Sequence, residues 1–249
     1  MKRFLCSLCL IALIAANNQG ARLFDGVNDS LRTSSTVDLS AVSKITIVFW
    51  LWWDAYGTDS HQCMELTADQ GLTTNGFVLI PNGSTGVWLV AFTGNVGGVV
   101  ATFTRPSAAA WHHFTILLDK SKSTQEVDAV YVDGSSQSLT FTANANNTNN
   151  WANSNLNFMS RNNASLWGAG RMAEAAIYPG VLLGATEASA LAGGASPSLV
   201  RPSIKPFYWP LIGRGSPEPE LRYGKTATVN GAVQTPHVRV YYPFNSMNN

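Results

Sequence analysis

Ile-Thr-Ile-Val-Phe-Trp-Leu-Trp-Trp, at residues 45–53, is the stretch that decides the fold of this chain. It is rich in β-branched and aromatic residues and contains neither glycine nor proline, which is the composition of a β-strand. Alternate residues of a strand point to opposite faces, and here both faces are largely apolar. The stretch therefore predicts a central strand that is covered on both sides.

Further segments of the same character follow along the chain, and turn residues such as Asp133-Gly134 separate several of them. We expect strands at 76–80, 87–92, 99–103, 113–118, 129–132, 138–141, 156–159 and 171–178. Many short strands with turns between them indicate a β-sandwich or a barrel. One short helix is expected at 183–192, and the asparagine-rich segment 143–157 is expected to be an exposed loop.

The composition excludes two classes of protein. The chain of 249 residues has 16 basic and 15 acidic side chains, which is a formal net charge of +1. Only 12% of its residues are charged, whereas 45% are hydrophobic. This balance gives no electrostatic footprint for nucleic acid, and the hydrophobic content is too high for a disordered chain. The polar surface must then come from uncharged side chains, which is typical of secreted or surface-displayed β-proteins.

The N-terminus is a separate apolar segment. Two basic residues precede an apolar run that ends at Ala16, and this pattern is typical of a secretory signal. The run is too short to cross a membrane as a helix, for which about 20 residues are needed. Residues 1–16 are therefore interpreted as a secretory signal or, alternatively, as an apolar arm used in assembly. Cys63 is the one cysteine outside this segment, and we expect it to be a buried small hydrophobe.

Four segments, in their order and spacing, resemble the laminin G-like, concanavalin A-like lectin and glucanase jelly roll. They are Arg22–Leu31; Ile45–Trp53; Trp111–Ile116 followed by Val130–Gly134; and Gly170–Tyr178 followed by Leu182–Glu187. The resemblance covers residues 22–192 and implies an all-β fold, a jelly-roll β-sandwich of two antiparallel sheets. Residues 17–249 are expected to form this single domain.

The C-terminal part resembles the segment that precedes the first strand in this family. Phe207–Leu211 and Val229–Ala232 carry this likeness, although here they lie at the end of the chain. We infer a circular permutation, in which residues 203–249 pack back on the first strand. The alternative is the start of a truncated second domain, which would leave an unpaired sheet edge. The motifs Ser196–Pro202 and His237–Pro243 also resemble a group of proteins common in bacteriophage genomes.

One acidic motif invites comparison with glycoside hydrolases on the same jelly roll. Those enzymes carry the pattern Glu-x-Asp-x-x-Glu on one strand, so that the nucleophile and the general acid face one cleft. Glu126 and Asp128 have the first part of this spacing, but the third carboxylate is absent. The sequence therefore predicts a non-enzymatic protein, in which these carboxylates are solvated charges at a hairpin.

Calcium is the metal that the resemblance implies, because laminin G-like domains often bind it. Asp25, Asn28 and Asp29 lie in a glycine-containing turn and offer the hard oxygens that calcium prefers. Glu174 would contribute if its strand neighbours that turn. The alternative is an Asx turn, in which Asp25 and Asn28 bond to their own backbone. Zinc is not expected, because no zinc-ligand spacing is present.

Tryptophans are the candidate sugar-binding platform, because ring faces pack on apolar sugar faces while amides bond to hydroxyls. The predicted carbohydrate-binding residues are Trp151, Trp167, Trp88 and Asn82. Trp151 is the strongest candidate, since it lies in the asparagine-rich segment, where core packing is not expected. Large aromatic residues more often fill a core, and this is the expectation for Trp50, Trp53 and Trp111.

Three functions are open at this point. The first is a non-enzymatic surface module that recognises glycans, helps to build a particle, or does both, either secreted or on a virion. The second is a structural subunit of a virion or an extracellular filament that binds no sugar. The third is a secreted carbohydrate-active hydrolase with an atypical site. The expected partners are glycans or neighbouring subunits, which would be copies of the same chain in a homo-oligomer. Nucleic acid is not an expected partner, and no transmembrane helix is expected.

Overall fold

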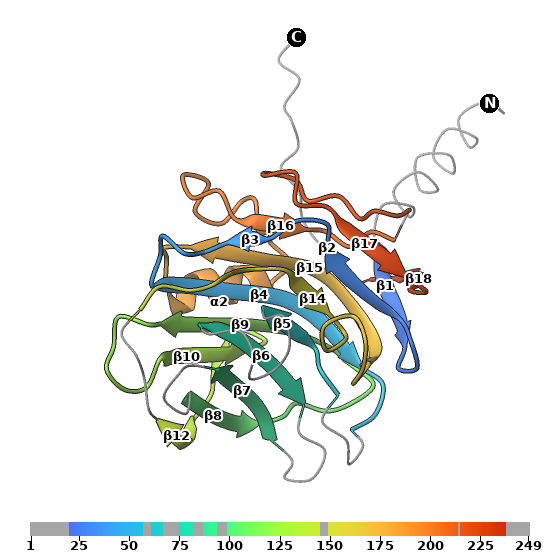
Figure 1. Cartoon of the computed structure of the whole chain (residues 1–249). Coiled ribbons are helices and arrows are strands. Elements are labelled where there is room, and N and C mark those ends of the chain that lie inside the picture. The colour runs from blue at the N-terminus through green and yellow to red at the C-terminus, as the bar shows by residue number, and fades with distance from the viewer. Residues whose placement is uncertain are drawn as a thin grey trace, which may run out of the picture.

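Two antiparallel sheets packed face to face form the body of the protein (Figure 1). The structure is a computed structural model, and it describes residues 20–56, 61–66, 75–81, 87–93, 99–144, 149–213 and 215–237. The predicted all-β jelly-roll sandwich is confirmed by this arrangement. The apolar segment 1–16 and the last residues, 238–249, lie outside the described residues. Within the described ranges, no helix is both long and apolar enough to cross a membrane.

Sheet A, as we call the sheet that holds the fold-deciding strand, places that strand centrally. In spatial order its strands are β11 (Ser135–Ser136), β10 (Val127–Val132), β9 (Trp111–Asp119), β4 (Lys44–Trp53), β15 (Ala169–Pro179), β1 (Gly20–Asp25) and β18 (Val233–Pro236), and β16 (Phe207–Trp209) also pairs with β15. β4 pairs with β9 on one side and with β15 on the other. Its predicted central position is therefore confirmed.

Sheet B is the opposing layer. In spatial order its strands are β12 (Thr140–Asn144), β8 (Val99–Thr104), β7 (Val87–Thr93), β6 (Gly76–Pro81), β5 (Met64–Leu66), β14 (Leu156–Phe158), β2 (Ser30–Thr33) and β17 (Ala227–Asn230). A short ribbon of β3 (Val37–Asp38) and β13 (Asn153–Ser154) adjoins the two sheets. The strands expected from the sequence are present, with ends that differ by up to three residues.

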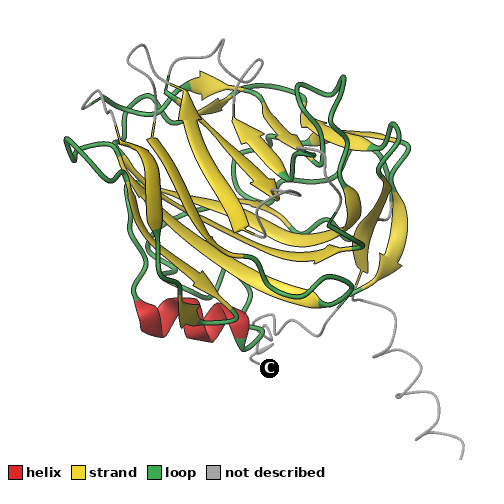
Figure 2. Ribbon diagram, turned by 90° about the horizontal axis from the view of Figure 1, so that it is seen from below, coloured by secondary structure: helices red, strands yellow, loops and turns green. Residues whose placement is uncertain are grey.

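The main core fills the space between the sheets, and a smaller apolar cluster covers the outer face of sheet A. Ile47, Phe49 and Trp53 of β4 face the main core, which also contains Cys63 as expected. On the other side of β4, Val48 packs with Leu191 of α2 (Ala185–Ala192). Figure 2 shows this helix lying outside the sandwich. Both faces of β4 are thus covered. This is favourable because both faces are apolar, and burial removes apolar surface from water.

The expectation that three tryptophans fill the core is correct for one of them. Trp53 is 5% exposed within the main core. Trp50 and Trp111 are partly buried and lie on the outer face of sheet A, where the His237 ring contacts both. The alternation of side chains along β4 explains this difference, since Trp50 and Trp53 are three positions apart and point to opposite faces.

The two ends of the described chain lie together. The hairpin of β17 and β18 gives each sheet its last strand: β17 pairs with β2 in sheet B, and β18 pairs with β1 in sheet A. Beneath this hairpin, Arg22 Nε donates to Glu218 Oε1 at 2.6 Å, and both side chains are buried. The C-terminal strands therefore lie beside the first strands of the chain.

Candidate functional site

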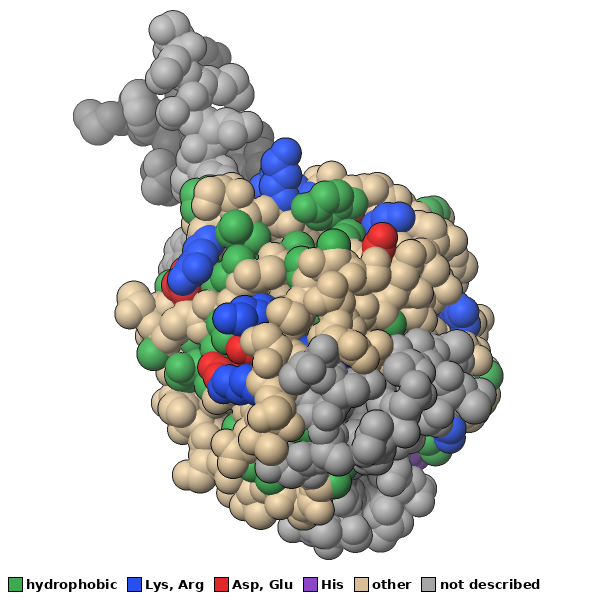
Figure 3. All heavy atoms as spheres, turned by 60° about the vertical axis from the view of Figure 1, so that its left-hand side comes forward, with side chains coloured by type: hydrophobic (Ala, Val, Ile, Leu, Met, Phe, Trp, Pro, Cys, Tyr) green, Lys and Arg blue, Asp and Glu red, His purple; other side chains and the backbone are tan. Residues whose placement is uncertain are grey.

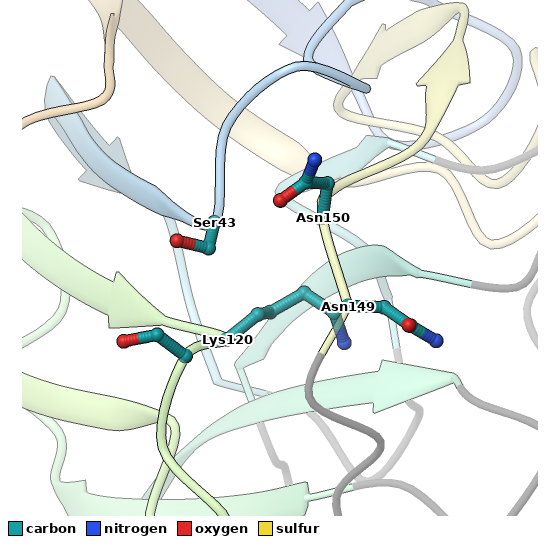
Figure 4. Close-up of a pocket in the computed structure, with 5 residues that line it drawn as sticks. Ser43, Lys120, Asn149 and Asn150 are labelled. Atoms are coloured by element: carbon teal, nitrogen blue, oxygen red, sulfur yellow. The ribbon is translucent and has the colours of Figure 1, made fainter.

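A polar pocket opens where three distant parts of the sequence meet at one end of the sandwich (Figure 4). Its volume is 440 Å³, and its lining consists of Ser43, Lys120, Ser121, Asn149 and Asn150. Ser43 precedes β4 and Lys120 follows β9, and these strands are antiparallel neighbours, so the two residues meet at the same edge. The Lys120 N–H donates to the Ser43 carbonyl at 2.8 Å, and Asn150 Nδ2 donates to the Ser40 carbonyl at 2.8 Å.

The pocket has a charged but internally neutralised floor. Lys120 is only 2% exposed, and its Nζ donates to Glu126 Oε1 at 3.1 Å. The same ammonium lies 5.2 Å from the centre of the Trp151 ring. Burial raises the pKa of the Glu126 carboxyl, and the nearby Lys120 opposes this rise. A buried cation and a buried anion compensate each other here, so the pair fixes the shape of the floor without giving the pocket a strong net charge.

The polar groups of the lining are suited to a neutral, hydroxyl-rich ligand. Serine hydroxyls and asparagine amides both donate and accept hydrogen bonds, as sugar hydroxyls do. The volume lies within the usual range for small-molecule sites, which is about 300–1,000 Å³. None of the five lining residues, all of which lie in the described ranges, carries an aromatic ring. Any recognition of a ligand there would therefore depend on hydrogen bonds instead of stacking.

Trp151 does not serve as an exposed platform, and that prediction is wrong. Its ring is 2% exposed and meets the Phe77 ring edge-on, with 6.3 Å between the ring centres. Its indole N–H donates to the Ser43 carbonyl at 2.8 Å. A tryptophan that can bury its ring and still satisfy its N–H gains more from the core than from water. Trp151 therefore supports the pocket from beneath.

Of the other three predicted sugar-binding residues, the structure describes the side chain of Trp167 alone. Trp88 belongs to β7, of which the backbone alone is described, and Asn82 lies outside the described residues. Trp167 is partly buried in the loop that leads into β15. The pocket does not include it.

Trp167 instead lies beside a group of buried polar side chains. The Gln62 N–H donates to the Leu166 carbonyl at 2.9 Å, which brings Gln62 next to Trp167. The indole N–H of Trp167, both amide atoms of Gln62 and the Ser160 hydroxyl are buried, and none has a hydrogen-bond partner in the part of the chain that is described. Such groups cost about 1–3 kcal/mol each if nothing satisfies them.

Comparison with known proteins identifies the family. The sequence pattern of the concanavalin A-like lectin/glucanases superfamily matches residues 25–186. The chain belongs to this superfamily. A search of curated proteins finds no match.

Solved structures of other proteins share the fold of this superfamily member. A heptameric SAP-like pentraxin from Limulus polyphemus superposes with a TM-score of 0.60 at 10% identity, over 88% of this chain and 95% of that one. A putative carbohydrate-binding protein from Bacteroides ovatus superposes with a TM-score of 0.61 at 15% identity, over 90% of this chain and 62% of that one. This chain thus spans less than two thirds of the second protein. At such low identity these likenesses show the fold alone.

The calcium ligands expected for this superfamily member do not form a site. The Asp25 carboxylate accepts the backbone N–H groups of Val27 at 2.8 Å and Asn28 at 3.2 Å, and these bonds lower its pKa. Asp29 Oδ2 accepts the Asp25 N–H at 3.0 Å. The alternative Asx arrangement is therefore correct for Asp25, whose carboxylate bonds to the backbone around it, while Asn28 contributes its backbone N–H to this turn.

Glu174 does not join this turn, and that part of the calcium prediction is wrong. Asp25 pairs with Ala169 of β15, and Glu174 is five positions further along that strand, about 16 Å away at ~3.3 Å per residue. Its buried carboxylate accepts the Tyr208 hydroxyl instead. In the described ranges, no group of three or more histidine, cysteine, aspartate or glutamate side chains could hold a metal ion. The four predicted calcium ligands are therefore not brought together in one group.

The two carboxylates of the acidic motif, which were compared with those of glycoside hydrolases, lie in different environments. Glu126 is buried against Lys120, whereas the exposed Asp128 pairs with Lys122. A shift in register between Val127 and Ala129 interrupts the alternation that would place both carboxylates on one face. The two groups therefore do not form an acid and nucleophile pair.

Proposed function

We propose that this chain is a non-enzymatic β-sandwich module that recognises glycans, and that it acts outside the cell or on a virion surface. The observation that carries the proposal is the polar pocket, whose lining offers two serine hydroxyls and two asparagine amides around a neutralised floor. Membership of the lectin/glucanase superfamily supports it. The fold likeness to a putative carbohydrate-binding protein is consistent with the same function.

The character of the surface also supports contact with a neutral ligand. Figure 3 shows a face on which charged side chains are scattered among uncharged polar groups and backbone. Low charge density leaves hydrogen bonding as the main polar interaction with a partner. A second copy of the chain could use the same surface, and we include homo-oligomerisation in the proposal.

Binding to a glycan array, followed by calorimetry with the tightest glycan, tests the proposal. We expect Asn149→Ala and Asn150→Ala to weaken binding at least tenfold, because each removes an amide that bonds to a sugar hydroxyl. Asn28→Ala is the matched control, since it removes an exposed amide from the turn after β1. The proposal is wrong if no glycan binds, or if all three variants bind as the parent protein does.

The same measurements separate the alternatives. A structural subunit would give ordered assemblies of native material and no glycan binding. A hydrolase would release sugar from the bound glycan, and Asp128→Ala would stop that release.

A further inference from the structure

The outer face of sheet B carries a polar row that the pocket does not use. The registers of β2, β14 and β5 place Arg32, Asn157 and Glu65 side by side. Their neighbours Leu31 and Phe158 belong to the main core. Since successive side chains of a strand alternate, Arg32 and Asn157 point away from the core, toward the outside of the sandwich.

The guanidinium of Arg32 is held by neutral groups. Its Nη1 donates to Asn162 Oδ1 at 2.6 Å, and its Nη2 donates to Asn155 Oδ1 at 3.3 Å. Arg32 is partly buried, and it forms no ion pair with any carboxylate of the described residues. Arg22 and Arg201 differ in this respect, because each pairs with a glutamate.

The groups that hold Arg32 are themselves fixed. Asn162 and Asn163 adopt left-handed backbone conformations, with φ of 49° and 57°, in a turn that returns to the face of sheet B. The Asn162 N–H donates to Glu65 Oε2 at 2.7 Å, and the Ser30 hydroxyl donates to Asn163 Oδ1 at 2.5 Å. Bonds from two strands thus tie the turn down. The guanidinium is therefore oriented before any ligand arrives.

An oriented cation with only neutral partners is complementary to an anion. Guanidinium and carboxylate match each other in plane and in spacing, and one carboxylate can accept two parallel N–H bonds. Partial burial reduces the screening of such an interaction by water and salt. Asn155 holds the cation in place, since its Nδ2 donates to the Thr33 carbonyl at 2.8 Å. The Asn162 amide can bond to a hydroxyl group of the same ligand.

We propose that Arg32, with Asn155 and Asn162, forms a subsite for the carboxylate of an acidic sugar. This inference rests on the proposed glycan-binding function and narrows its ligand class to glycans that contain uronic or other carboxylated sugars. The subsite is separate from the pocket, since its residues lie on the outer face of sheet B and none of them lines the pocket.

Two probes that differ at one carbon test the subsite. Methyl β-D-glucuronide carries a carboxylate where methyl β-D-glucoside carries a hydroxymethyl group. We follow the arginine Nε–H signals of the full chain by NMR, and the signal that disappears in Arg32→Lys identifies Arg32. The glucuronide is expected to shift this signal saturably, with a Kd at least about fivefold lower than that of the glucoside. Added salt should weaken the glucuronide interaction.

Charge-matched variants separate a local contact from the net charge. Arg32→Gln has no Arg32 signal, so calorimetry measures its binding. It should bind the two probes within about twofold of each other, because it lacks the fork that prefers carboxylate. Arg222→Gln removes one charge from an exposed position and should keep the preference. The subsite is refuted if both probes act alike on the parent protein, if neither shifts the Arg32 signal, or if the two variants lose the preference equally.

The subsite and the pocket can fail independently. Asn149→Ala should leave the shift of the Arg32 signal unchanged. Glycan binding that depends on Asn149, together with an Arg32 signal that no probe moves, would refute the subsite and keep the proposed function.

Discussion

Two histidines on the outer face of sheet A, the buried His113 and the partly buried His237, make the stability of the fold depend on pH. The His113 ring lies 5.2 Å from that of Trp50, and the His237 ring lies 4.6 Å from that of Trp111. Burial lowers the pKa of both to about 3, and for His113 the neighbouring His237 adds to the effect. Their neutral forms are the ones that the fold accommodates.

This arrangement predicts a loss of stability in mild acid. A histidine pKa near 6.5 in the unfolded chain that falls to about 3 on folding stabilises the fold above pH 6.5. That contribution disappears as the pH falls from about 6.5 toward 3, by up to about 1.4 kcal/mol per pH unit for each imidazole. Urea unfolding at pH 6.5 and pH 5 measures the slope.

His113→Phe is expected to reduce this slope, since phenylalanine cannot take up a proton. The interval above pH 5 is chosen because most carboxylates stay ionised there. An unchanged slope in the variant would contradict the assignment.

Individual residues were also the hardest to predict from sequence. An asparagine-rich neighbourhood suggested that Trp151 is exposed, but its ring reaches the core and its N–H reaches the Ser43 carbonyl. A short-range pattern does not contain that long-range bond. The turn at Asp25 was easier to predict, because an Asx turn uses only neighbouring backbone groups. It was one of the two alternatives that the sequence left open.

At the scale of elements, the backbone of β15 comes very close to the backbone of β4 at Gly170. Gly170 has a φ of 153°, and a Cβ at this position would lie 2.1 Å from the Trp52 carbonyl oxygen of β4. Only glycine allows the two strands to pair at this point, because any side chain would collide with main-chain atoms.

Gly170→Ala is therefore expected to lower the free energy of unfolding by about 3 kcal/mol, through overpacking and backbone strain together. Gly224→Ala is the control, since its φ of 70° is equally unusual but no atom lies within 4 Å of the added Cβ. We expect that variant to lose about 1 kcal/mol. Urea unfolding compares them, and equal losses would show that the contact with Trp52 does not matter.

Strand positions were predictable because composition and alternation act within a few residues. The irregularities were not. Glu174, with a φ of 53°, interrupts the pairing of β15 with β4, and its carboxylate turns to Tyr208. This hydroxyl partner is 34 residues away in sequence, and periodicity along one strand does not reveal it.

At the scale of the whole molecule, one buried ion pair joins the beginning of the described chain to its end. Arg22 donates to Glu218 at 2.6 Å and to the Ala232 carbonyl at 2.6 Å. Removing one member of a buried pair leaves an uncompensated charge. Arg22→Met is expected to cost about 3–5 kcal/mol of stability for this reason.

Arg201→Met provides the comparison for this prediction. Arg201 pairs with Glu187 at the surface, and its loss is expected to cost less than about 1 kcal/mol. Thermal unfolding of both variants checks the difference. Similar melting temperatures would mean that the pair between the chain ends contributes little.

The resemblance of separate segments to one family predicted the sandwich, because several motifs in order constrain the topology. The pocket was not predicted. Ser43, Lys120 and Asn150 are distant in sequence and come together only when β4 and β9 pair. The asparagine run was a signal for a polar loop, but it does not show which strand ends that loop meets.

The position of β1 between β15 and β18 also determines when the molecule can be completed. A ribosome makes the chain from its N-terminus, so residues 20–25 emerge long before either of their partners, which begin at residues 169 and 233. The first strand must wait through most of synthesis with both edges unpaired, and late pairing of this kind slows folding. Until the final hairpin is released, the nascent protein exposes a strand with unpaired edges, to which a chaperone could bind.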